Sequence, residues 1–195
     1  MDFDLTKKKY LENLYKPDKS KKGNVDKQIS YLIDFINSLK NYYTTSSCAG
    51  RIVLIELPRD GKKKDAEWLL SSHDLVDKID LLDYKFDRHP VYFKQESLIL
   101  HVCARTFEDA NKMLLLAREV GFKRSGLIAT SKRFIIEIFG TEQLTAPIYD
   151  NKLLVGQEFI DYMVNDGNVK LQSARNRAEK FYGLLKEENL EKEKT

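Results

Sequence analysis

Residues 44–51 read Thr-Thr-Ser-Ser-Cys-Ala-Gly-Arg, and this run carries the residue types that best suit ligand chemistry in the chain. Its hydroxyl groups and small residues let a ligand come close to backbone N–H groups, and Arg51 can bind a carboxylate or a phosphate. Cys48 is a candidate nucleophile, because a thiol near a suitable base is reactive. The run predicts either a ligand site or a polar turn between a helix and a strand.

Four further residues stand where a polar or aromatic group is unusual. His101 interrupts the apolar stretch 98–104, and His73 ends the stretch that begins at Trp68. Arg105 follows where a strand gives way to a helix, a common position for ligand-binding groups. Each histidine is either a general base or a hydrogen-bonded structural residue. Trp68 is either part of the core or a platform on which a base stacks.

A smaller run of the same kind reads Gly121-Phe-Lys-Arg-Ser-Gly126. In this run Ser125 and Gly126 follow two cations. These cations either interact with the dipole at the C-terminus of a helix or bind an anionic ligand. No G-x-G-x-x-G, P-loop, H-E-x-x-H or G-x-S-x-G motif occurs in the sequence. We therefore expect neither a Rossmann-type cofactor domain nor the common zinc-protease and hydrolase sites.

The composition is typical of a globular protein. Of 195 residues, 42% are hydrophobic, and no apolar stretch approaches the roughly 20 residues of a membrane helix. The segment Met1–Lys9 is charged and lacks the apolar region of a signal peptide. Cys48 and Cys103 give neither a disulfide framework nor a zinc-ligand spacing. We expect a cytoplasmic protein with no metal and no membrane association.

The net charge of +3 is too small to indicate a nucleic-acid binder, but the cations are clustered. Lysines outnumber acidic residues between Lys7 and Lys22, and three consecutive lysines occupy positions 62–64. The C-terminal helical pattern holds four more cations, namely Lys170, Arg175, Arg177 and Lys180. These clusters either follow phosphates or make a charged, soluble surface.

The hydrophobic periodicity predicts the elements that position these residues. The predicted helices are Thr6–Tyr15, stopped by Pro17; Ile29–Leu39, capped by Asn24; Leu75–Tyr84, capped by Asp74; a helix from Thr106 to Gly121; and Glu158–Glu187, with Gly167 as a possible break. The predicted strands are Ile52–Leu57, Glu67–Ser71, Val91–Lys94, Leu98–Ala104, Leu127–Thr130, Phe134–Phe139 and Thr145–Tyr149, with a turn at Asp60-Gly61.

This order of elements predicts the fold class. Two β–β–α units followed by a strand pair favour an α+β fold with a mixed β-sheet and helices packed mainly on one face. We expect a single domain over residues 1–195, because no linker separates two globular parts. Its N-terminal helices would lie in 1–40, its sheet core in 41–150 and its C-terminal helix or helices in 156–190.

Several of these segments resemble one known family. The run from Tyr43 to Ile52 resembles the signature of the tRNA wybutosine-synthesizing protein 3 family, and so does the run from Asp18 to Asp26. Other segments match in the same order and spacing: Trp68 to His73, Leu100-His-Val-Cys-Ala-Arg105, Gly121 to Gly126 and Phe181-Tyr182. The resemblance covers nearly the whole chain and is to the compact archaeal members, which lack the long acidic tail of the eukaryotic ones.

The resemblance implies an S-adenosylmethionine-dependent tRNA methyltransferase without an ordinary Rossmann motif. Its implied substrate is 7-(3-amino-3-carboxypropyl)-4-demethylwyosine, or a related demethylwyosine, 3′ of the anticodon of tRNA(Phe), methylated at N-4. Arg51 would hold a carboxylate, His73 or His101 would take the proton, and Trp68 would stack on the tricyclic base. These roles are our hypothesis, since the family motif does not assign them. We place Ser46, Ser47, Cys48, Gly50, Arg105, Ser125 and Gly126 in the pocket and Lys21, Lys22 and Arg175 in contact with tRNA.

Two other functions remain open from the residues alone. One is a non-catalytic RNA-binding module that uses the basic N-terminal stretch and the C-terminal helix. The other is a cysteine hydrolase built on Cys48, which would need a nearby base. Binding of S-adenosylmethionine distinguishes the methyltransferase from both.

Overall fold

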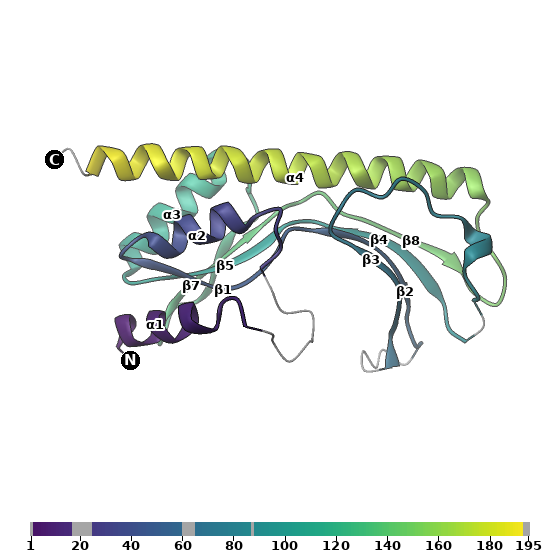
Figure 1. The fold of residues 1–195 in the computed structure, drawn as a ribbon, viewed down its shortest axis with the longest axis horizontal. Coiled ribbons are helices and arrows are strands. Elements are labelled where there is room, and N and C mark those ends of the chain that lie inside the picture. The colour runs from purple at the N-terminus through teal and green to yellow at the C-terminus, as the bar shows by residue number, and fades with distance from the viewer. Residues whose placement is uncertain (1, 17–24, 60–64, 87, 193–195) are drawn as a thin grey trace. The chain divides into compact units, whose positions relative to one another are not determined.

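We describe residues 2–16, 25–59, 65–86 and 88–192 of a computed structural model, whose elements are labelled in Figure 1. The chain forms two compact units, each assembled from separate segments. Unit 1 comprises 1–49, 98–141 and 175–195, and unit 2 comprises 50–97 and 142–174. The single domain expected from the sequence stays a prediction.

Unit 1 is built on a four-stranded antiparallel sheet. The strand order is β1-β5-β7-β6, formed by Tyr42–Cys48, Ile99–Ala104, Phe134–Phe139 and Gly126–Ala129. The helices α2 (Ser30–Ser38) and α3 (Phe107–Glu119) lie on one face, and α1 (Phe3–Asn13) lies on the other (Figure 1). The side of the sheet under α2 and α3 is apolar, because alternate residues such as Leu100, Val102 and Ile136 are fully buried.

The helix α3 begins and ends as its sequence predicts. The Thr106 side chain accepts a hydrogen bond from Asp109 N–H, so Thr106 is the N-cap. Gly121 has a φ of 104°, and the N–H groups of Gly121 and Phe122 donate to Arg118 O and Ala117 O. This pairing is a Schellman motif, and glycine is the residue that adopts its left-handed position without strain. The cap directs the chain from α3 into the segment before β6.

Unit 2 is built on a second four-stranded antiparallel sheet, of order β3-β2-β4-β8. Its strands are Arg51–Glu56 (β2), Glu67–Ser72 (β3), Val91–Glu96 (β4) and Leu144–Tyr149 (β8), and a short 3-10 helix, η2, covers Leu81–Asp83. The helix α4 runs from Gln157 to Lys192, and its residues up to 174 belong to unit 2. The core joins one sheet face to this part of α4 through Ile52, Leu54, Phe93, Ile160, Met163, Val164 and Leu171.

Gly167 lies inside α4 and does not break it. A Cβ atom at this position would come within 3.3 Å of Ile52 Cδ1 and 3.5 Å of Phe93 Cζ. The glycine therefore allows α4 to lie close to β2 and β4, although glycine weakens a helix interior by about 1 kcal/mol relative to alanine. The break predicted at this position is wrong.

The α+β class and the absence of a Rossmann arrangement are confirmed, but the sheet prediction needs correction. Instead of one mixed sheet, the described strands form two sheets in which every pairing is antiparallel. The strands run as predicted to within about two residues, because their apolar alternation was clear. The run at residues 44–48, where we considered a polar turn, is instead most of β1, whose partners sequence alone does not reveal.

The helix predicted over Leu75–Tyr84 is also wrong, since only η2 is helical there. Side chains of α4 form hydrogen bonds with the backbone groups that would be paired with one another in a helix. Asn168 exchanges two hydrogen bonds with the backbone of Val76, and Gln157 bonds Leu81 N–H and Ile79 O. Local periodicity does not show such tertiary partners.

The start of the first helix differs from the prediction, and three other predicted features cannot be compared. The first helix begins at Phe3 and not at Thr6, because the Asp2 carboxylate caps it by accepting from Asp4 and Leu5 N–H. Pro17, Asn24 and the Asp60-Gly61 turn lie outside the described residues. Among the helices that the structure describes, none is both long and apolar enough to cross a membrane.

Candidate active site

The hydroxyl-rich run begins with a structural residue. Thr44 is buried, and it exchanges two hydrogen bonds with Asn37 of α2, at 2.9 Å through its hydroxyl and 2.8 Å through its N–H. A β-bulge follows between Thr44 and Ser46, where the register with β5 shifts. The bulge turns the side chains that follow, so Ser46 lies opposite His101 and Ser47 lies opposite Leu100.

Ser46 and Ser47 therefore face different sides of the sheet. Leu100 belongs to the buried side under α2 and α3, whereas His101 is partly exposed on the other side. At the end of the run, Ala49 N–H donates to Asp26 Oδ2 at 2.8 Å. This bond brings together two of the segments that carry the family resemblance, the one ending at Asp26 and the one around Cys48.

Three side chains form a hydrogen-bonded array across β1, β5 and β7. Ser46 Oγ lies 2.9 Å from His101 Nδ1, and His101 Nε2 lies 2.9 Å from Glu137 Oε2. Ser46 is exposed, while the side chains of His101 and Glu137 are 25% and 36% exposed. The register pairs each of these residues directly with the next, so the array is a cross-strand row.

The array fixes the direction in which a proton can move. A carboxylate only accepts hydrogen bonds, so the neutral His101 carries its hydrogen on Nε2 and donates it to Glu137. Nδ1 then accepts from the hydroxyl of Ser46. A proton received at Ser46 can pass to His101, and Glu137 stabilises the imidazolium that forms, as in a serine–histidine–carboxylate triad. The sequence indicated Ser46 and His101, but Glu137 gave no signal beyond being an acidic residue in a strand.

In unit 2, Arg51 lies between an acid and an aromatic ring. Its Nε donates to Glu96 Oε2 at 2.6 Å, and its Cζ lies 4.4 Å from the centre of the Trp68 ring. The two terminal nitrogens of Arg51 make no hydrogen bond to any described residue, so the fork that binds carboxylates stays available. Trp68 is 44% exposed, which excludes a purely internal role.

His73 is positioned by the backbone next to Arg51. Its Nδ1 lies 3.0 Å from Gly50 O, and because a carbonyl only accepts, Nδ1 carries the hydrogen. Gly50 has a φ of 85°, the left-handed conformation that glycine adopts without strain. The position of the His73 ring thus depends on the Gly50 carbonyl, which the left-handed glycine backbone orients.

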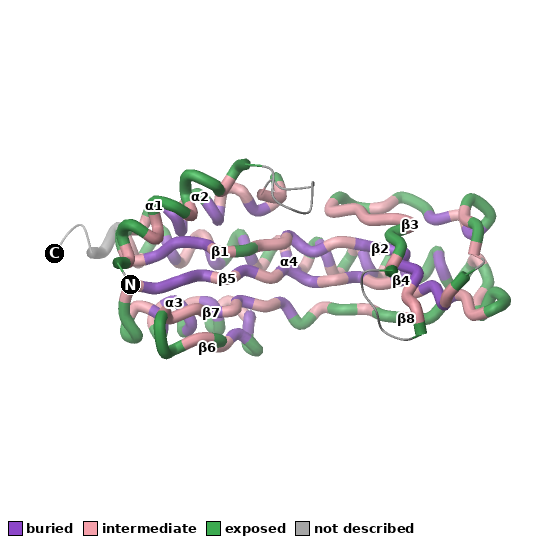
Figure 2. Tube along the Cα trace, turned by 90° about the horizontal axis from the view of Figure 1, so that it is seen from below, coloured by how far each residue is buried: buried purple, intermediate pink, exposed green. Residues whose placement is uncertain are grey.

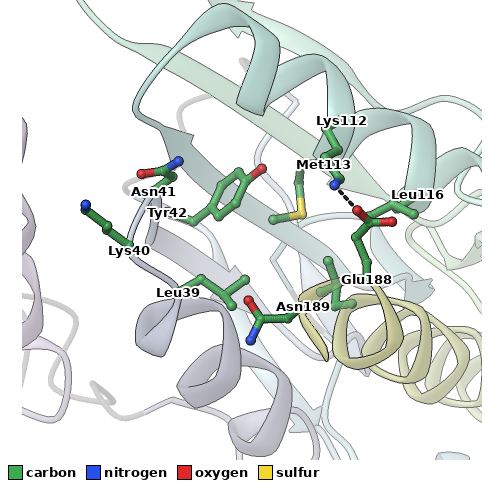
Figure 3. Close-up of a pocket in the computed structure, with 10 residues that line it drawn as sticks. Leu39, Lys40, Asn41, Tyr42, Lys112, Met113, Leu116, Glu188 and Asn189 are labelled. Carbon is green, nitrogen blue, oxygen red and sulfur yellow. Dashed lines mark hydrogen bonds and ion pairs between the residues drawn. The ribbon is translucent and has the colours of Figure 1, made fainter. Parts of the chain in front are cut away.

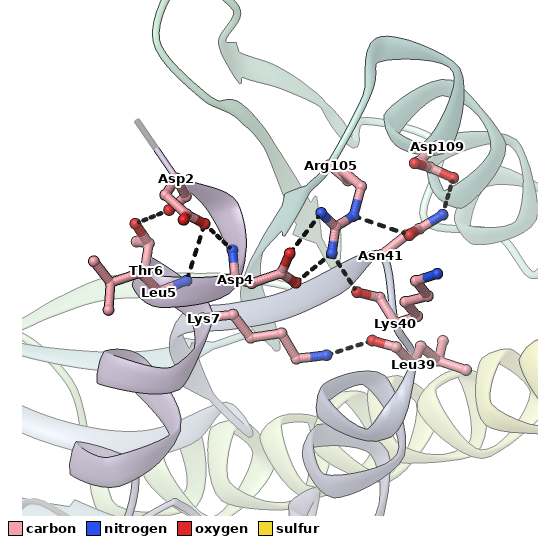
Figure 4. Close-up of polar contacts among 10 residues, drawn as sticks. All are labelled: Asp2, Asp4, Leu5, Thr6, Lys7, Leu39, Lys40, Asn41, Arg105 and Asp109. Atoms are coloured by element: carbon pink, nitrogen blue, oxygen red, sulfur yellow. Dashed lines mark hydrogen bonds and ion pairs between the residues drawn. The ribbon is translucent and has the colours of Figure 1, made fainter.

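Arg105 is held inside unit 1 by several partners (Figure 4). It binds both carboxylate oxygens of Asp4, donates from Nε to Asn41 Oδ1 at 3.1 Å, and lies over the Phe3 ring at 4.3 Å. The hydrogen bond from Arg105 is the main reason that the pKa of Asp4 lies below its ordinary value. These contacts make Arg105 an anchor for α1. The ligand-binding role that the sequence suggested for Arg105 stays a prediction.

The remaining predicted residues have structural surroundings or lie outside the described residues. Ser125 is buried, and its hydroxyl accepts from Phe139 N–H at 3.1 Å, so it joins the loop to β7. Gly126 is the first residue of β6, and Arg175 is half-buried on α4. Lys21, Lys22 and the lysines at 62–64 lie outside the described residues.

Two cavities lined by described residues of unit 1 are small. One of about 150 Å³ lies where the chain before β1 meets α3 and the end of α4, with Tyr42, Met113 and Leu116 as apolar lining and a Lys112–Glu188 ion pair beside it (Figure 3). A second of about 100 Å³ adjoins Arg105 and Arg133. Both are smaller than the roughly 300–1,000 Å³ typical of pockets for drug-sized ligands.

The fold and these residues define an α+β protein outside the Rossmann class, with a hydrogen-bonded Ser–His–Glu array on one sheet and a cation–aromatic cluster on another. The chain belongs to the methyltransferase TYW3 family, which it matches over residues 5–187.

Its similarity to individual proteins is extensive. It is 41% identical to the tRNA(Phe) 7-((3-amino-3-carboxypropyl)-4-demethylwyosine(37)-N(4))-methyltransferase of Thermococcus sibiricus, over 92% of both chains. It is 34% identical to the human tRNA wybutosine-synthesizing protein 3 homolog, covering 88% of this chain and 69% of that one. The solved structure of the PH1069 protein from Pyrococcus horikoshii has a TM-score of 0.83 and 34% identity, covering 93% of this chain and 94% of that one.

Proposed function

We propose that this protein methylates N-4 of 7-(3-amino-3-carboxypropyl)-4-demethylwyosine at position 37 of tRNA(Phe), with S-adenosylmethionine as methyl donor. The family membership and the names of relatives that cover nearly the whole chain support this activity and substrate. A methyltransferase of this kind acts on tRNA next to the anticodon, and we place the reaction in the cytoplasm. No observation favours the non-catalytic RNA-binding module or the cysteine hydrolase over this function.

The observation that carries the proposed chemistry is the Ser46–His101–Glu137 array. Methylation of a ring nitrogen that bears a hydrogen releases a proton, so the enzyme needs a group that accepts it. We propose that Ser46 Oγ accepts the proton from the methylated ring nitrogen, while the hydroxyl hydrogen of Ser46 passes to His101 Nδ1. Glu137 keeps His101 in the tautomer that can receive this proton and stabilises the charge that results.

S-adenosylmethionine supplies a methyl group on a positively charged sulfur, so the protein has only to align, shield and deprotonate the acceptor. Two observations in unit 2 fit a ligand that carries an amino acid group. The terminal nitrogens of Arg51 are available for a carboxylate, and the left-handed Gly50 lets a ligand approach the backbone closely. We assign Arg51 to a carboxylate, either of the cofactor or of the acceptor side chain.

A direct experiment incubates the protein with labelled S-adenosylmethionine and tRNA(Phe) that carries the unmethylated precursor. Mass spectrometry of the nucleosides is expected to show one labelled methyl group on the tricyclic base. Calorimetry with S-adenosylmethionine alone is expected to show binding. Arg51→Ala loses this binding if Arg51 holds the carboxylate of the cofactor, and keeps it if Arg51 holds the carboxylate of the acceptor side chain. If the protein binds tRNA in a salt-dependent manner but neither binds the cofactor nor transfers a methyl group, the RNA-binding module is correct instead.

A further inference from the structure

Among the described residues of unit 2, no helix packs on one face of its sheet. Ile52, Leu54 and Phe93 face α4, so alternation turns the neighbouring residues to the opposite side. We call this opposite side the open face. Strand register assigns it Arg51, Val53, Ile55, Trp68, Ser71, Tyr92, Lys94, Glu96, Thr145 and Pro147.

The open face carries an aromatic row across all four strands. Trp68 pairs with Ile55, Ile55 with Tyr92, and Tyr92 with Pro147, so the four residues form one line perpendicular to the strands. Neighbouring strands lie about 4.8 Å apart, which places the backbones of Trp68 and Tyr92 about 10 Å apart, with Ile55 between them. Each ring can therefore take a different flat ligand group.

The rings of this row are accessible and not engaged with other aromatic rings. Trp68 is 44% exposed, and Tyr92 is half-buried. Neither forms a ring pair with another aromatic residue within the described ranges, unlike Tyr84, Phe86 and Tyr149 in the same unit. Antiparallel sheets that expose aromatic side chains in this manner bind single-stranded RNA by stacking its bases.

The charges of the open face fit an anionic backbone. Lys94 occupies the next row of the sheet, opposite Val53 and Thr145. Its ammonium group forms no ion pair or hydrogen bond with any residue that the structure describes. Arg51 lies over the Trp68 ring, pairs with Glu96 through Nε, and is already assigned to a carboxylate in the proposed function. The cation that remains for a phosphate on this face is Lys94.

We propose that the open face of unit 2 is a binding surface for single-stranded RNA. In this proposal bases stack on Trp68 and Tyr92, the exposed Pro147 contacts a base edge, and Lys94 pairs with a phosphate. The proposal rests on the proposed function, since it takes the occupant to be unpaired nucleotides of the tRNA substrate that flank the target. An RNA partner is favoured over a protein partner because the face combines separate π-surfaces with an unpaired cation.

The single tryptophan of the chain gives a direct readout, because Trp68 is itself in the row. An unmodified anticodon stem–loop RNA is titrated into the protein at fixed salt, without S-adenosylmethionine, and Trp68 fluorescence is followed. We expect saturable quenching by the stem–loop, and weaker binding without quenching by the same RNA annealed into a full duplex.

Two variants test the residues of the face. Tyr92→Ala is expected to raise the dissociation constant about 5- to 150-fold, the loss of one base–aromatic stack, while Tyr92→Phe retains wild-type affinity. Lys94→Gln is expected to lower the magnitude of the salt slope by about 1. The matched controls are Tyr162→Ala, which changes a 64% exposed tyrosine on α4, and Lys152→Gln; both are expected to bind as the wild type does.

The outcomes separate this proposal from the proposed function. If Tyr92→Ala and Lys94→Gln bind the stem–loop as the wild type does, the open face is not the RNA surface, whether or not methyl transfer occurs. Equal binding of duplex and stem–loop, without quenching, likewise overturns it. Quenching that depends on Tyr92, in a protein without methyl transfer, supports the surface and contradicts the proposed function.

Discussion

Glu137 of β7 accepts a hydrogen bond from His101 of β5 at 2.9 Å, and strand register places the two residues directly opposite each other. The carboxylate therefore decides which nitrogen of His101 carries the hydrogen and which nitrogen faces Ser46. Because the relationship is fixed by pairing in the sheet, it depends little on flexible loops. Glu137 acts through His101 and is a positioning residue.

Replacing Glu137 by glutamine tests this role. We expect Glu137→Gln to lower kcat for methyl transfer by at least about 100-fold, because the amide removes the negative charge and no longer selects one histidine tautomer. KM for tRNA should change little, since Glu137 is not assigned to RNA binding. Steady-state kinetics check the split between kcat and KM. A variant with wild-type kcat would remove Glu137 from the mechanism.

Arg51→Ala is expected to abolish methyl transfer while lowering stability by no more than about 1 kcal/mol, because the Arg51–Glu96 pair is partly exposed. Arg59→Ala is the matched control, since Arg59 also pairs with an acid, Asp150, in unit 2. The control should retain activity. Methyl-transfer assays and thermal melts on both variants make the comparison; retained activity in Arg51→Ala would refute its role in binding a carboxylate.

Gly167 should be required for the close approach of α4 to β2. We expect Gly167→Val to destabilise the protein by about 1–3 kcal/mol, because its side chain overlaps Ile52 and Phe93. Gly183→Ala, in the same helix with nothing within 4 Å of the added Cβ, should instead stabilise it by up to about 1 kcal/mol. Urea unfolding measures both. Equal effects of the two changes would show that Gly167 has no packing role.

The attachment of helix α1 to the rest of unit 1 should depend on pH through the ionisation of Asp4. None of its residues is buried, as Figure 2 shows by its green and pink colouring, so polar and ring contacts hold it in place. The hydrogen bond from Arg105 lowers the pKa of Asp4, so the stabilisation is present above the ordinary value of 3.8 and is lost as pH falls through the lowered value.

Hydrogen exchange followed by mass spectrometry measures this effect. At neutral pH, Asp4→Asn should speed exchange in α1 but not in β5, and the difference from the wild type should disappear once acid protonates Asp4. If the variant exchanges like the wild type at neutral pH, Asp4 does not anchor α1.

Local signals in the sequence were sufficient for much of the fold. Every described strand except β1 followed from its apolar pattern, and Thr106 and Gly121 marked the two ends of α3. Two errors came from tertiary effects that no local pattern shows. Side chains of α4 replace helical hydrogen bonds in the segment before η2, and strand pairing produces two antiparallel sheets in place of one mixed sheet.

The candidate site was predicted only in part, for the same reason. Ser46, His101, Arg51 and Trp68 carry residue types that are unusual in their positions, so sequence alone could indicate them. Glu137, by contrast, becomes informative only when strand register places it against His101. Arg105 shows the opposite case, since its residue type suggested a ligand, while the structure supplies Asp4, Asn41 and Phe3 as its partners.

The most direct test of the central claim is the single-turnover rate of methyl transfer by His101→Gln, with tRNA(Phe) that carries the unmethylated precursor and saturating S-adenosylmethionine. His89→Gln serves as the matched control. The proposed relay predicts a loss of at least about 100-fold in His101→Gln, with cofactor binding unchanged, and a wild-type rate in the control. A wild-type rate in His101→Gln would contradict the assignment of Ser46, His101 and Glu137 to proton transfer.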